Sequence, residues 1–224
     1  MSVSQLSASA QNYLKVIWSL QEWTDEPTSA SSIAERVGVR LSTASDAIRK
    51  LTEQGLLNHA RYGSVELTAQ GRDHAVAMVR RHRLIETFLV QVLGYSWDQV
   101  HDEAEILEHA VSDFMVDAID LHLGHPTRDP HGDPIPAADG TITSPDARQL
   151  SQVQSGAQVR IERISDDDPE LLKFFTSHDI AVGSQLLVRD GAPFSGALEV
   201  SRPGEAAIPL GSTACAAVWV TAMV

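Results

Sequence analysis

Cysteine is nearly absent from this chain, because Cys215 is the single cysteine among 224 residues. An intrachain disulfide is therefore excluded. A lone thiol fits a reducing compartment, so we expect a cytoplasmic protein.

Long hydrophobic runs are also missing. The most apolar stretch, residues 214–224, is too short to span a bilayer and is typical of a buried closing strand. The N-terminus lacks the basic region and apolar run of a signal peptide. We therefore expect no membrane partner.

Positive charge is scarce, with 17 Lys and Arg against 30 Asp and Glu and a net charge of −13. Such a balance argues weakly against a nucleic-acid partner for the chain as a whole. The acids are unevenly distributed, however. Residues 1–75 carry seven basic and eight acidic residues, whereas residues 129–224 carry six and thirteen. The first third is close to neutral and can still meet DNA.

The first third has the pattern of a winged helix-turn-helix. Apolar residues at spacings of three and four predict a helix over 9–22. Residues 29–37 and 42–54 predict two more helices, which stop at Gly38 and Gly55, with Ser42 and Thr43 as capping candidates for the second. Two short strands around Gly63 would form the wing.

In a helix-turn-helix the second helix presents its N-terminal residues to base edges in the major groove. Residues 35–50 hold four basic residues against two acids, which is the local surplus that phosphate contact needs. The bland alternative is a solvated polar helix on a small helical domain. The residues expected to contact DNA are Arg40, Ser42, Thr43, Asp46, Arg49, Lys50 and, on the wing, Arg61.

The remaining pattern predicts a mainly α chain with a β domain. A helix over 68–93 should end at Gly94, and a second helix should run over 97–123 with one apolar stripe from Leu107 to Leu121. Short β-rich runs in 150–224 suit a small closed barrel. We therefore expect a winged-helix domain over 1–75, a helical domain over 76–125, a Pro/Gly linker over 126–149 and a barrel over 150–224.

A dense set of metal-ligand side chains lies in VHDEAEILEH, residues 100–109. On a helix His101, Glu105, Glu108 and His109 project from one side. An acidic solvated face would explain them equally well. A second pair, His82 and Glu86, is again one turn apart on the preceding helix.

Two such sets facing each other would repel unless a cation lay between them. Imidazole and carboxylate donors without thiolate favour Mn²⁺ or Fe²⁺ over a closed structural zinc site. The pattern therefore predicts a divalent metal site.

These motifs together resemble a known family. NYLKVIW, the helix-turn-helix, RRHRLIETFL, VHDEAEILEH, the GDPIP segment and DIAVGS are similar to the diphtheria-toxin-repressor family of metal-dependent transcriptional repressors. The resemblance covers nearly the whole chain. It implies an N-terminal winged helix, a helical dimerisation domain and a C-terminal SH3-like (FeoA-type) β-barrel. It also implies a homodimer that binds palindromic double-stranded DNA operators when loaded with Mn(II) or Fe(II).

The family pattern implies two neighbouring metal sites, one with His82, Glu86 and His101. The other would use Asn12, Glu105, Glu108 and His109. A glutamate at Glu105 resembles the manganese-sensing branch of the family, so Mn(II) is the expected cofactor, with Fe(II) as the alternative.

Two positions depart from the manganese-sensor pattern. Asn12 is an amide where an aspartate is common, and Lys15 stands where some members carry an acid. The barrel domain often lends a ligand to the first site, and Asp168 is the expected donor. Metal would tie Asn12 to the dimerisation helices and so set the spacing of the recognition helices.

Two other functions would fit parts of the sequence. A helical-bundle metalloenzyme is disfavoured, because no Glu-x-x-His motif occurs and the helix-turn-helix would have no role. A metal-independent winged-helix DNA-binding protein stays open, with the acid cluster as a surface feature. We expect a repressor that controls metal homeostasis and is not an enzyme.

Overall fold

The computed structural model describes residues 3–23, 26–59, 63–193 and 195–223. The chain divides into two compact units. The first contains Met1–Ile85, Ala104–His125 and Ile135–Ile142, and the second contains Glu86–Glu103, Pro126–Pro134 and Thr143–Val224. One helix, α4 (Ala69–Leu93), runs through both units.

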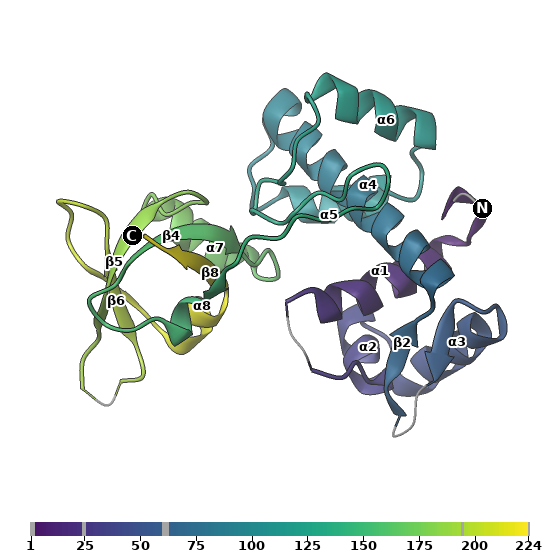
Figure 1. Cartoon of the computed structure of the whole chain (residues 1–224), viewed down its shortest axis with the longest axis horizontal. Coiled ribbons are helices and arrows are strands. Elements are labelled where there is room, and N and C mark those ends of the chain that lie inside the picture. The colour runs from purple at the N-terminus through teal and green to yellow at the C-terminus, as the bar shows by residue number, and fades with distance from the viewer. Residues whose placement is uncertain (1–2, 24–25, 60–62, 194, 224) are drawn as a thin grey trace. The chain divides into compact units, whose positions relative to one another are not determined.

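Three helices and a hairpin form the N-terminal part (Figure 1). After a short 3-10 turn at Val3–Gln5 come α1 (Ala8–Glu22), α2 (Ala30–Val37) and α3 (Leu41–Glu53). Strands β1 (Leu57–His59) and β2 (Val65–Leu67) pair antiparallel. Three helices followed by a hairpin confirm the predicted winged helix-turn-helix order. Leu14, Ile17 and Ile33 are fully buried in the core that these elements share.

The caps of two helices show why they begin where they do. Ser29 and Ser32 form a reciprocal capping box that starts α2. The prediction that Ser42 or Thr43 caps α3 is wrong, because α3 begins one residue earlier with Arg40 at its N-cap position. Ser42 and Thr43 therefore lie inside the helix with exposed side chains.

The predicted single helix over 97–123 is also wrong. The chain forms α5 (Val100–Leu107) and α6 (Asp113–His122) with a turn between them. Ser112 ends the continuity, because its side chain accepts a hydrogen bond from the backbone N–H of Met115 and caps α6. Helical periodicity alone cannot show such a restart.

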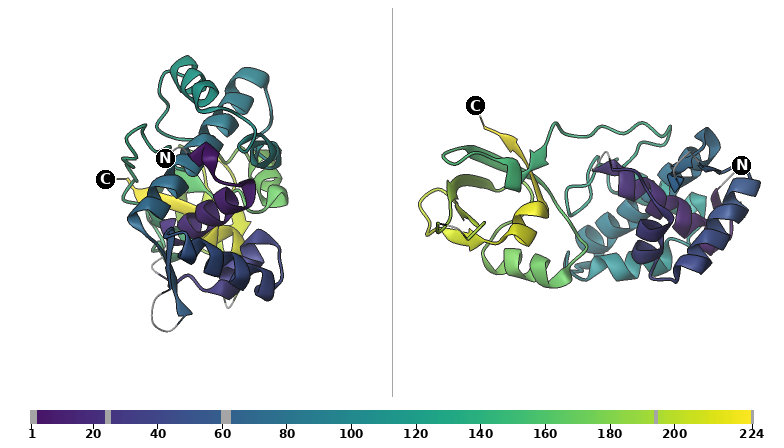
Figure 2. Two further views of the ribbon diagram at one scale, coloured as in Figure 1. Left: turned by 90° about the vertical axis from the view of Figure 1, so that its right-hand side faces the viewer. Right: turned by 90° about the horizontal axis from the view of Figure 1, so that it is seen from below.

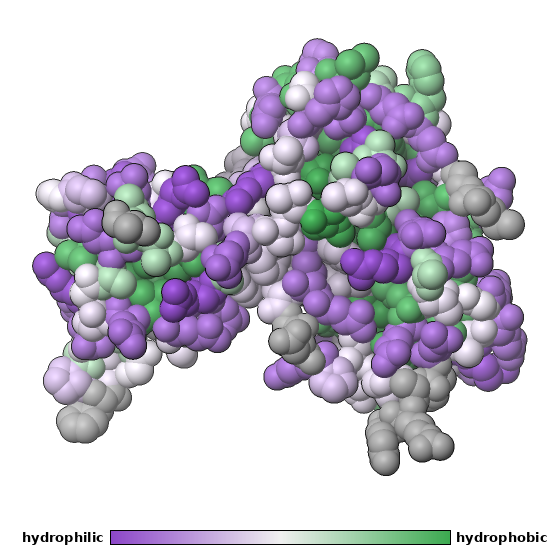
Figure 3. Space-filling model, viewed as in Figure 1, coloured by the Kyte–Doolittle hydropathy of each residue, from purple (hydrophilic) through white to green (hydrophobic). Residues whose placement is uncertain are grey.

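The expected apolar stripe is therefore not a core. Phe114 is 84% exposed and Leu121 is 69% exposed. Hydrophobic side chains reach the surface over α6 in the space-filling view (Figure 3).

The C-terminal part is a curved six-stranded antiparallel sheet (Figure 2). The strand order is β3-β8-β4-β5-β6-β7. Its elements are β3 (Arg148–Gln149), a 3-10 turn (Leu150–Gln152), β4 (Gln158–Ile164), α7 (Pro169–Ser177), β5 (Gln185–Asp190), β6 (Leu198–Ser201), β7 (Ile208–Leu210), α8 (Ser212–Ala216) and β8 (Val218–Ala222).

The helix expected at 169–178 is confirmed as α7, but the expectation of one helical interruption is wrong, because α8 is a second helix and the closing strand begins only at Val218. Closure of the barrel is not observed either. Among the described residues no ladder joins β3 to β7, so the sheet is open. Phe175 of α7 and Cys215 of α8 pack into the same core as the strands.

No helix within the described ranges has the length and hydrophobicity that a membrane crossing requires.

The segment between α6 and β3 carries buried side chains. Asp129, His131 and Asp133 are at most 8% exposed, and the side chain of Asp129 accepts hydrogen bonds from the backbone N–H groups of the other two. Gly132 lies directly against β4, where an added Cβ would be 2.0 Å from the carbonyl oxygen of Glu162. This part of the chain is built into the second unit rather than hanging free.

Gly132→Ala should therefore destabilise the protein more than Gly156→Ala. Both glycines have a positive φ, +91° and +89°, but only Gly132 has backbone within contact distance of a Cβ. Gly156→Ala should cost about 1–2 kcal/mol from backbone strain alone, and Gly132→Ala should add the cost of moving β4. Urea unfolding of the full chain measures both. Equal losses would show that the close approach has no energetic weight.

Candidate metal centre and nucleic-acid interface

Helix α3 exposes one polar face. Ala44, Ile48 and Leu51 are buried against the N-terminal core. The opposite face carries the residues predicted to contact DNA, which are all exposed: Arg40, Ser42, Thr43, Asp46, Arg49 and Lys50. Arg49 donates to Asp46 at 3.0 Å, an exposed ion pair that water screens. Arg61 of the wing lies outside the described residues.

A first cluster of metal-ligand side chains joins Glu86 of α4, His101 of α5 and Asp166, which precedes α7. His101 Nδ1 lies 2.8 Å from Asp166 Oδ2 and 3.3 Å from Glu86 Oε1. Glu86 is 1% exposed. His82 lies one turn before Glu86 on α4, and its predicted role as a ligand with Glu86 and His101 stays a prediction.

The charges in this cluster compensate one another. Burial would lower the pKa of His101, but its ion pairs with Asp166 and Glu86 raise that pKa to about 11. Burial would raise the pKa of Asp166, but the ion pair with His101 and nearby positive charge hold it well below the usual range. A protonated His101 therefore serves as the cation between two carboxylates.

Two further buried residues, Asp129 and His131, lie beside Glu86, and the sequence motifs did not indicate them. Ligand atoms of Glu86, Asp129 and His131 lie within 4.8 Å of one another. The Nε2–H of His131 donates to the carbonyl oxygen of Trp97 at 2.7 Å. That bond fixes the ring and leaves Nδ1, with no hydrogen-bond partner among the described atoms, 3.9 Å from Glu86 Oε2. The alternating Asp-x-His-x-Asp pattern in DPHGD was the sequence feature that could have indicated these two residues.

Two acids of the loop before α7 have different surroundings. Asp166 lies at His101, whereas Asp168 caps α7 by accepting hydrogen bonds from the backbone N–H groups of Glu170 and Leu171. Pro169 at the start of α7 sets this boundary. Asp168 as a metal ligand stays a prediction, and Asp166 is the residue of this loop that lies at His101.

A second cluster gathers Glu105, Glu108 and His82 around Lys15 of α1. The Lys15 ammonium donates to Glu105 Oε1 at 2.5 Å and to Glu108 Oε1 at 2.6 Å. His82 Nδ1 lies 2.6 Å from Glu108 Oε2. Burial would raise the pKa of Glu108, but the hydrogen bond from His82 and the charge of Lys15 lower it.

Asn12 is not drawn into this cluster. Within the described part of the chain its side chain makes no hydrogen bond or ion pair, and Gln11 takes the contact instead. Gln11 Oε1 lies 2.7 Å from His109 Nδ1, and the Gln11 amide donates to the carbonyls of Val3 and Leu6. His109 Nε2 is left 3.5 Å from Glu108 Oε1. Gln11 and Lys15 are one helical turn apart, and this spacing could have indicated that both lie on the face of α1 that contacts His109 and Glu108.

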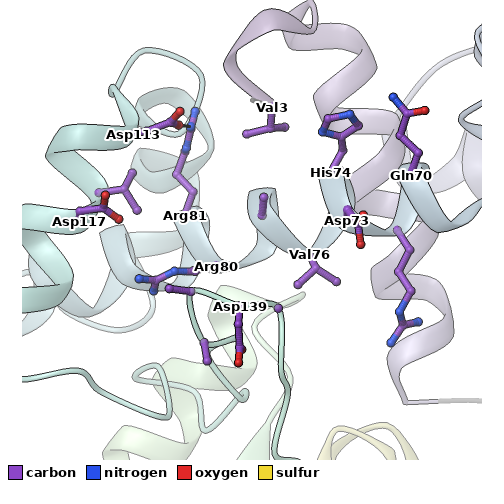
Figure 4. Close-up of a pocket in the computed structure, with 16 residues that line it drawn as sticks. Val3, Gln70, Asp73, His74, Val76, Arg80, Arg81, Asp113, Asp117 and Asp139 are labelled. Carbon is purple, nitrogen blue, oxygen red and sulfur yellow. Dashed lines mark hydrogen bonds and ion pairs between the residues drawn. The ribbon is translucent and has the colours of Figure 1, made fainter. Parts of the chain in front are cut away.

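A separate pocket of about 580 Å³ lies among α4, α6 and residues 137–140 (Figure 4). Arg81 points toward Asp113 and pairs with it, and Arg80 pairs with Asp120 at 2.9 Å. His74 is buried there, and burial lowers its pKa. Among the described residues no group of metal-ligand side chains lies close together in the lining of this pocket.

The two clusters differ in how well their ligand atoms and charges suit a divalent ion. The Glu86 cluster offers imidazole nitrogens and carboxylate oxygens without thiolate, a set that suits Mn²⁺ and Fe²⁺. Its cation is a proton on His101, which a metal can displace. The Glu108 cluster already contains an ammonium group, which fits a divalent ion poorly.

Three family models match the chain. Residues 5–65 match the iron dependent repressor N-terminal DNA binding domain, residues 68–137 its metal binding and dimerisation domain, and residues 148–222 the FeoA domain.

Curated relatives include the iron-dependent repressor IdeR of Mycobacterium leprae, 34% identical over 178 residues, with 74% of this chain and 77% of the relative aligned. The diphtheria toxin repressor of Corynebacterium diphtheriae is 30% identical over 201 residues, 84% of this chain and 88% of the relative.

A solved structure of a manganese-dependent transcriptional repressor in complex with manganese is 53% identical, with a TM-score of 0.91, over 96% of this chain and 100% of that one. The manganese regulator SloR is 32% identical, with a TM-score of 0.80, over 96% and 98%. The fold, the helix-turn-helix and these relatives agree: the chain belongs to the diphtheria-toxin-repressor family of metal-dependent, DNA-binding transcriptional repressors, and not to a family of enzymes.

Proposed function

We propose that this repressor responds to Mn(II), with Fe(II) as the alternative activating ion, and controls metal homeostasis from the cytoplasm, where its DNA is. The observation that carries the proposal is the cluster of Glu86, His101 and Asp166, with Asp129 and His131 beside it. All its donors are nitrogen or carboxylate oxygen. A manganese-dependent relative that is 53% identical supports the choice of ion.

The ligands would come from α4, α5 and the loop before α7. Glu86 and His101 hold the ion from the helices, and Asp166 adds a carboxylate from the FeoA domain. If metal binds the DNA-competent dimer more tightly than other states of the protein, bound metal raises the affinity for DNA. Bound DNA then raises the affinity for metal by the same free energy. Couplings of this kind are typically about 1–3 kcal/mol.

For DNA, we propose that the exposed face of α3 enters the major groove of a palindromic operator as part of a homodimer. Arg40, Ser42, Thr43 and Asp46 would reach base edges near the helix N-terminus. Arg49 and Lys50, one turn later, would follow the phosphates. Arg61 would contribute from the wing. The exposed apolar residues of α5 and α6 offer the dimer a hydrophobic surface: Ile106, Phe114, Met115 and Leu121.

The test is selection of genomic fragments by the purified protein in Mn²⁺ and in chelator. Capture of a few palindromic sites only in Mn²⁺ is the expected result. Equal capture in both conditions would leave a metal-independent DNA-binding protein.

Asp166→Asn should weaken Mn²⁺ binding by more than about 100-fold, because loss of a direct ligand exceeds the 10–100-fold effect of outer-sphere changes. Asp168→Asn is the matched control, since asparagine also caps helices well. Isothermal titration with Mn²⁺ measures both variants. Equal losses, or none for Asp166→Asn, would remove Asp166 from the site.

Mn²⁺ affinity should rise with pH by about tenfold per unit between pH 6 and 8. The pKa of His101, raised to about 11, keeps the metal-free ring protonated in this range, so each bound ion must displace that proton. Titrations in two buffers of different ionisation enthalpy count the released protons. A pH-independent affinity would contradict the protonated His101.

Lys50→Ala should weaken operator binding and flatten its salt dependence, because the variant neutralises fewer DNA phosphates. The log–log slope should change by about 0.9 for each phosphate that lysine neutralised. Lys173→Ala removes an exposed lysine of α7 and serves as the control. Fluorescence anisotropy across a salt series in saturating Mn²⁺ reports both slopes. An unchanged slope for Lys50→Ala would place Lys50 away from the phosphates.

A further inference from the structure

The side chain of Lys15 is an ammonium group inside a cluster of metal-ligand residues. The residue is 6% exposed, although lysine is almost always solvated. Its Nζ lies 2.5 Å from Glu105 Oε1, 2.6 Å from Glu108 Oε1 and 3.4 Å from His82 Nδ1. These three residues are the group whose donor atoms lie within 4.8 Å of one another, the distance range of a metal site. The ammonium group therefore lies at their common centre.

The fold places Lys15 there and holds it. Lys15 belongs to the face of α1 that packs inward, between buried Leu14 and Val16. Gln11, one turn earlier, is held by the carbonyls of Val3 and Leu6. On the opposite side Arg81 donates to the backbone carbonyl of Glu108 at 3.1 Å, which fixes the end of α5.

The donor atoms of this cluster are already engaged. Glu108 accepts from Lys15 on Oε1 and faces the ring nitrogen of His82 on Oε2, and it is fully buried. Glu105 accepts from Lys15 on Oε1. A divalent ion at the centre would meet a like charge and would have to displace an ammonium group that compensates two carboxylates.

We infer that Lys15 is an internal counter-ion that closes the Glu105–Glu108 cluster to divalent metal, so that metal regulation rests on the Glu86–His101–Asp166 centre alone. The second half of this inference rests on the function proposed above. The first half concerns only residues of this chain. Helix α1 is then fastened to α4 and α5 by Lys15 whether metal is present or not. Asn12, an amide where an aspartate is common, then has no metal ion to bind in this cluster.

Metal counting on the full chain tests this inference. Equilibrium dialysis against Mn²⁺, followed by elemental analysis, gives ions per chain for the wild type and for Glu105→Gln. The expected result is the same number and the same affinity for both proteins. Loss of one ion per chain in Glu105→Gln would overturn the inference, because it would make Glu105 a ligand in the wild type.

The reverse experiment removes the ammonium group. Lys15→Met keeps an unbranched apolar side chain as far as Cε without the ammonium group and should gain one Mn²⁺ per chain. Adding Glu108→Gln should abolish that gain. Lys173→Met is the matched control, because Lys173 pairs with Glu170 on an exposed surface and should change nothing. A folded Lys15→Met protein, verified by circular dichroism, that gains no ion would also overturn the inference.

The two proposals fail in different ways. Wild type that binds no Mn²⁺ would refute the proposed function, and a gain of one ion in Lys15→Met would still support the counter-ion. Wild type whose Mn²⁺ is lost in Asp166→Asn but kept in Glu105→Gln supports both. Wild type that keeps its Mn²⁺ in Asp166→Asn and loses it in Glu105→Gln refutes both.

Discussion

Buried carboxylates that need a positive charge are the constraint on which this structure depends. Glu86 and Glu108 are at most 1% exposed, and an unpaired buried carboxylate is strongly destabilising. Each receives a cation from the chain itself. His101, held protonated, lies at Glu86 and Asp166, while the ammonium of Lys15 lies at Glu105 and Glu108. The two cations differ in how they can be displaced. A metal ion at Glu86 needs to displace only the ring proton of His101, whereas a metal ion at Glu108 would have to displace the buried side chain of Lys15.

The same helices serve packing and charge compensation. Helix α4 runs through both compact units and carries both His82 and Glu86. Leu14 and Ile17 of α1 pack in the N-terminal core, and Lys15 of the same helical turn donates a hydrogen bond to Glu108. A metal sensor built in this way has few independent parts. Helix α1, which contacts Glu105 and Glu108 through Lys15, packs in the same core as α3.

The helix-turn-helix, the long helix and the β domain were predictable because each has a local signal. Ser29 with Gly38, the run ending at Gly94 and the β-rich segments between turns all mark elements by neighbours in sequence. The break at Ser112 and the cap at Arg40 were missed, since periodicity continues across a cap and the first residue of a helix need not bring its own capping side chain. The open sheet was missed because strand-like runs do not reveal which edges pair.

The motifs identify the family and predict most of the residue types that would hold a metal, because paired His and Glu at helical spacing must share a face. Which of these side chains meet, and what lies between them, depends on the fold. Asp166 rather than Asp168 reaches His101, since Pro169 and the cap of α7 fix the loop. His131 joins Glu86 from a segment far along the chain. Lys15 looked like a missing ligand in the sequence and is a buried cation in the fold, because whether a charge is compensated depends on neighbours that only folding supplies.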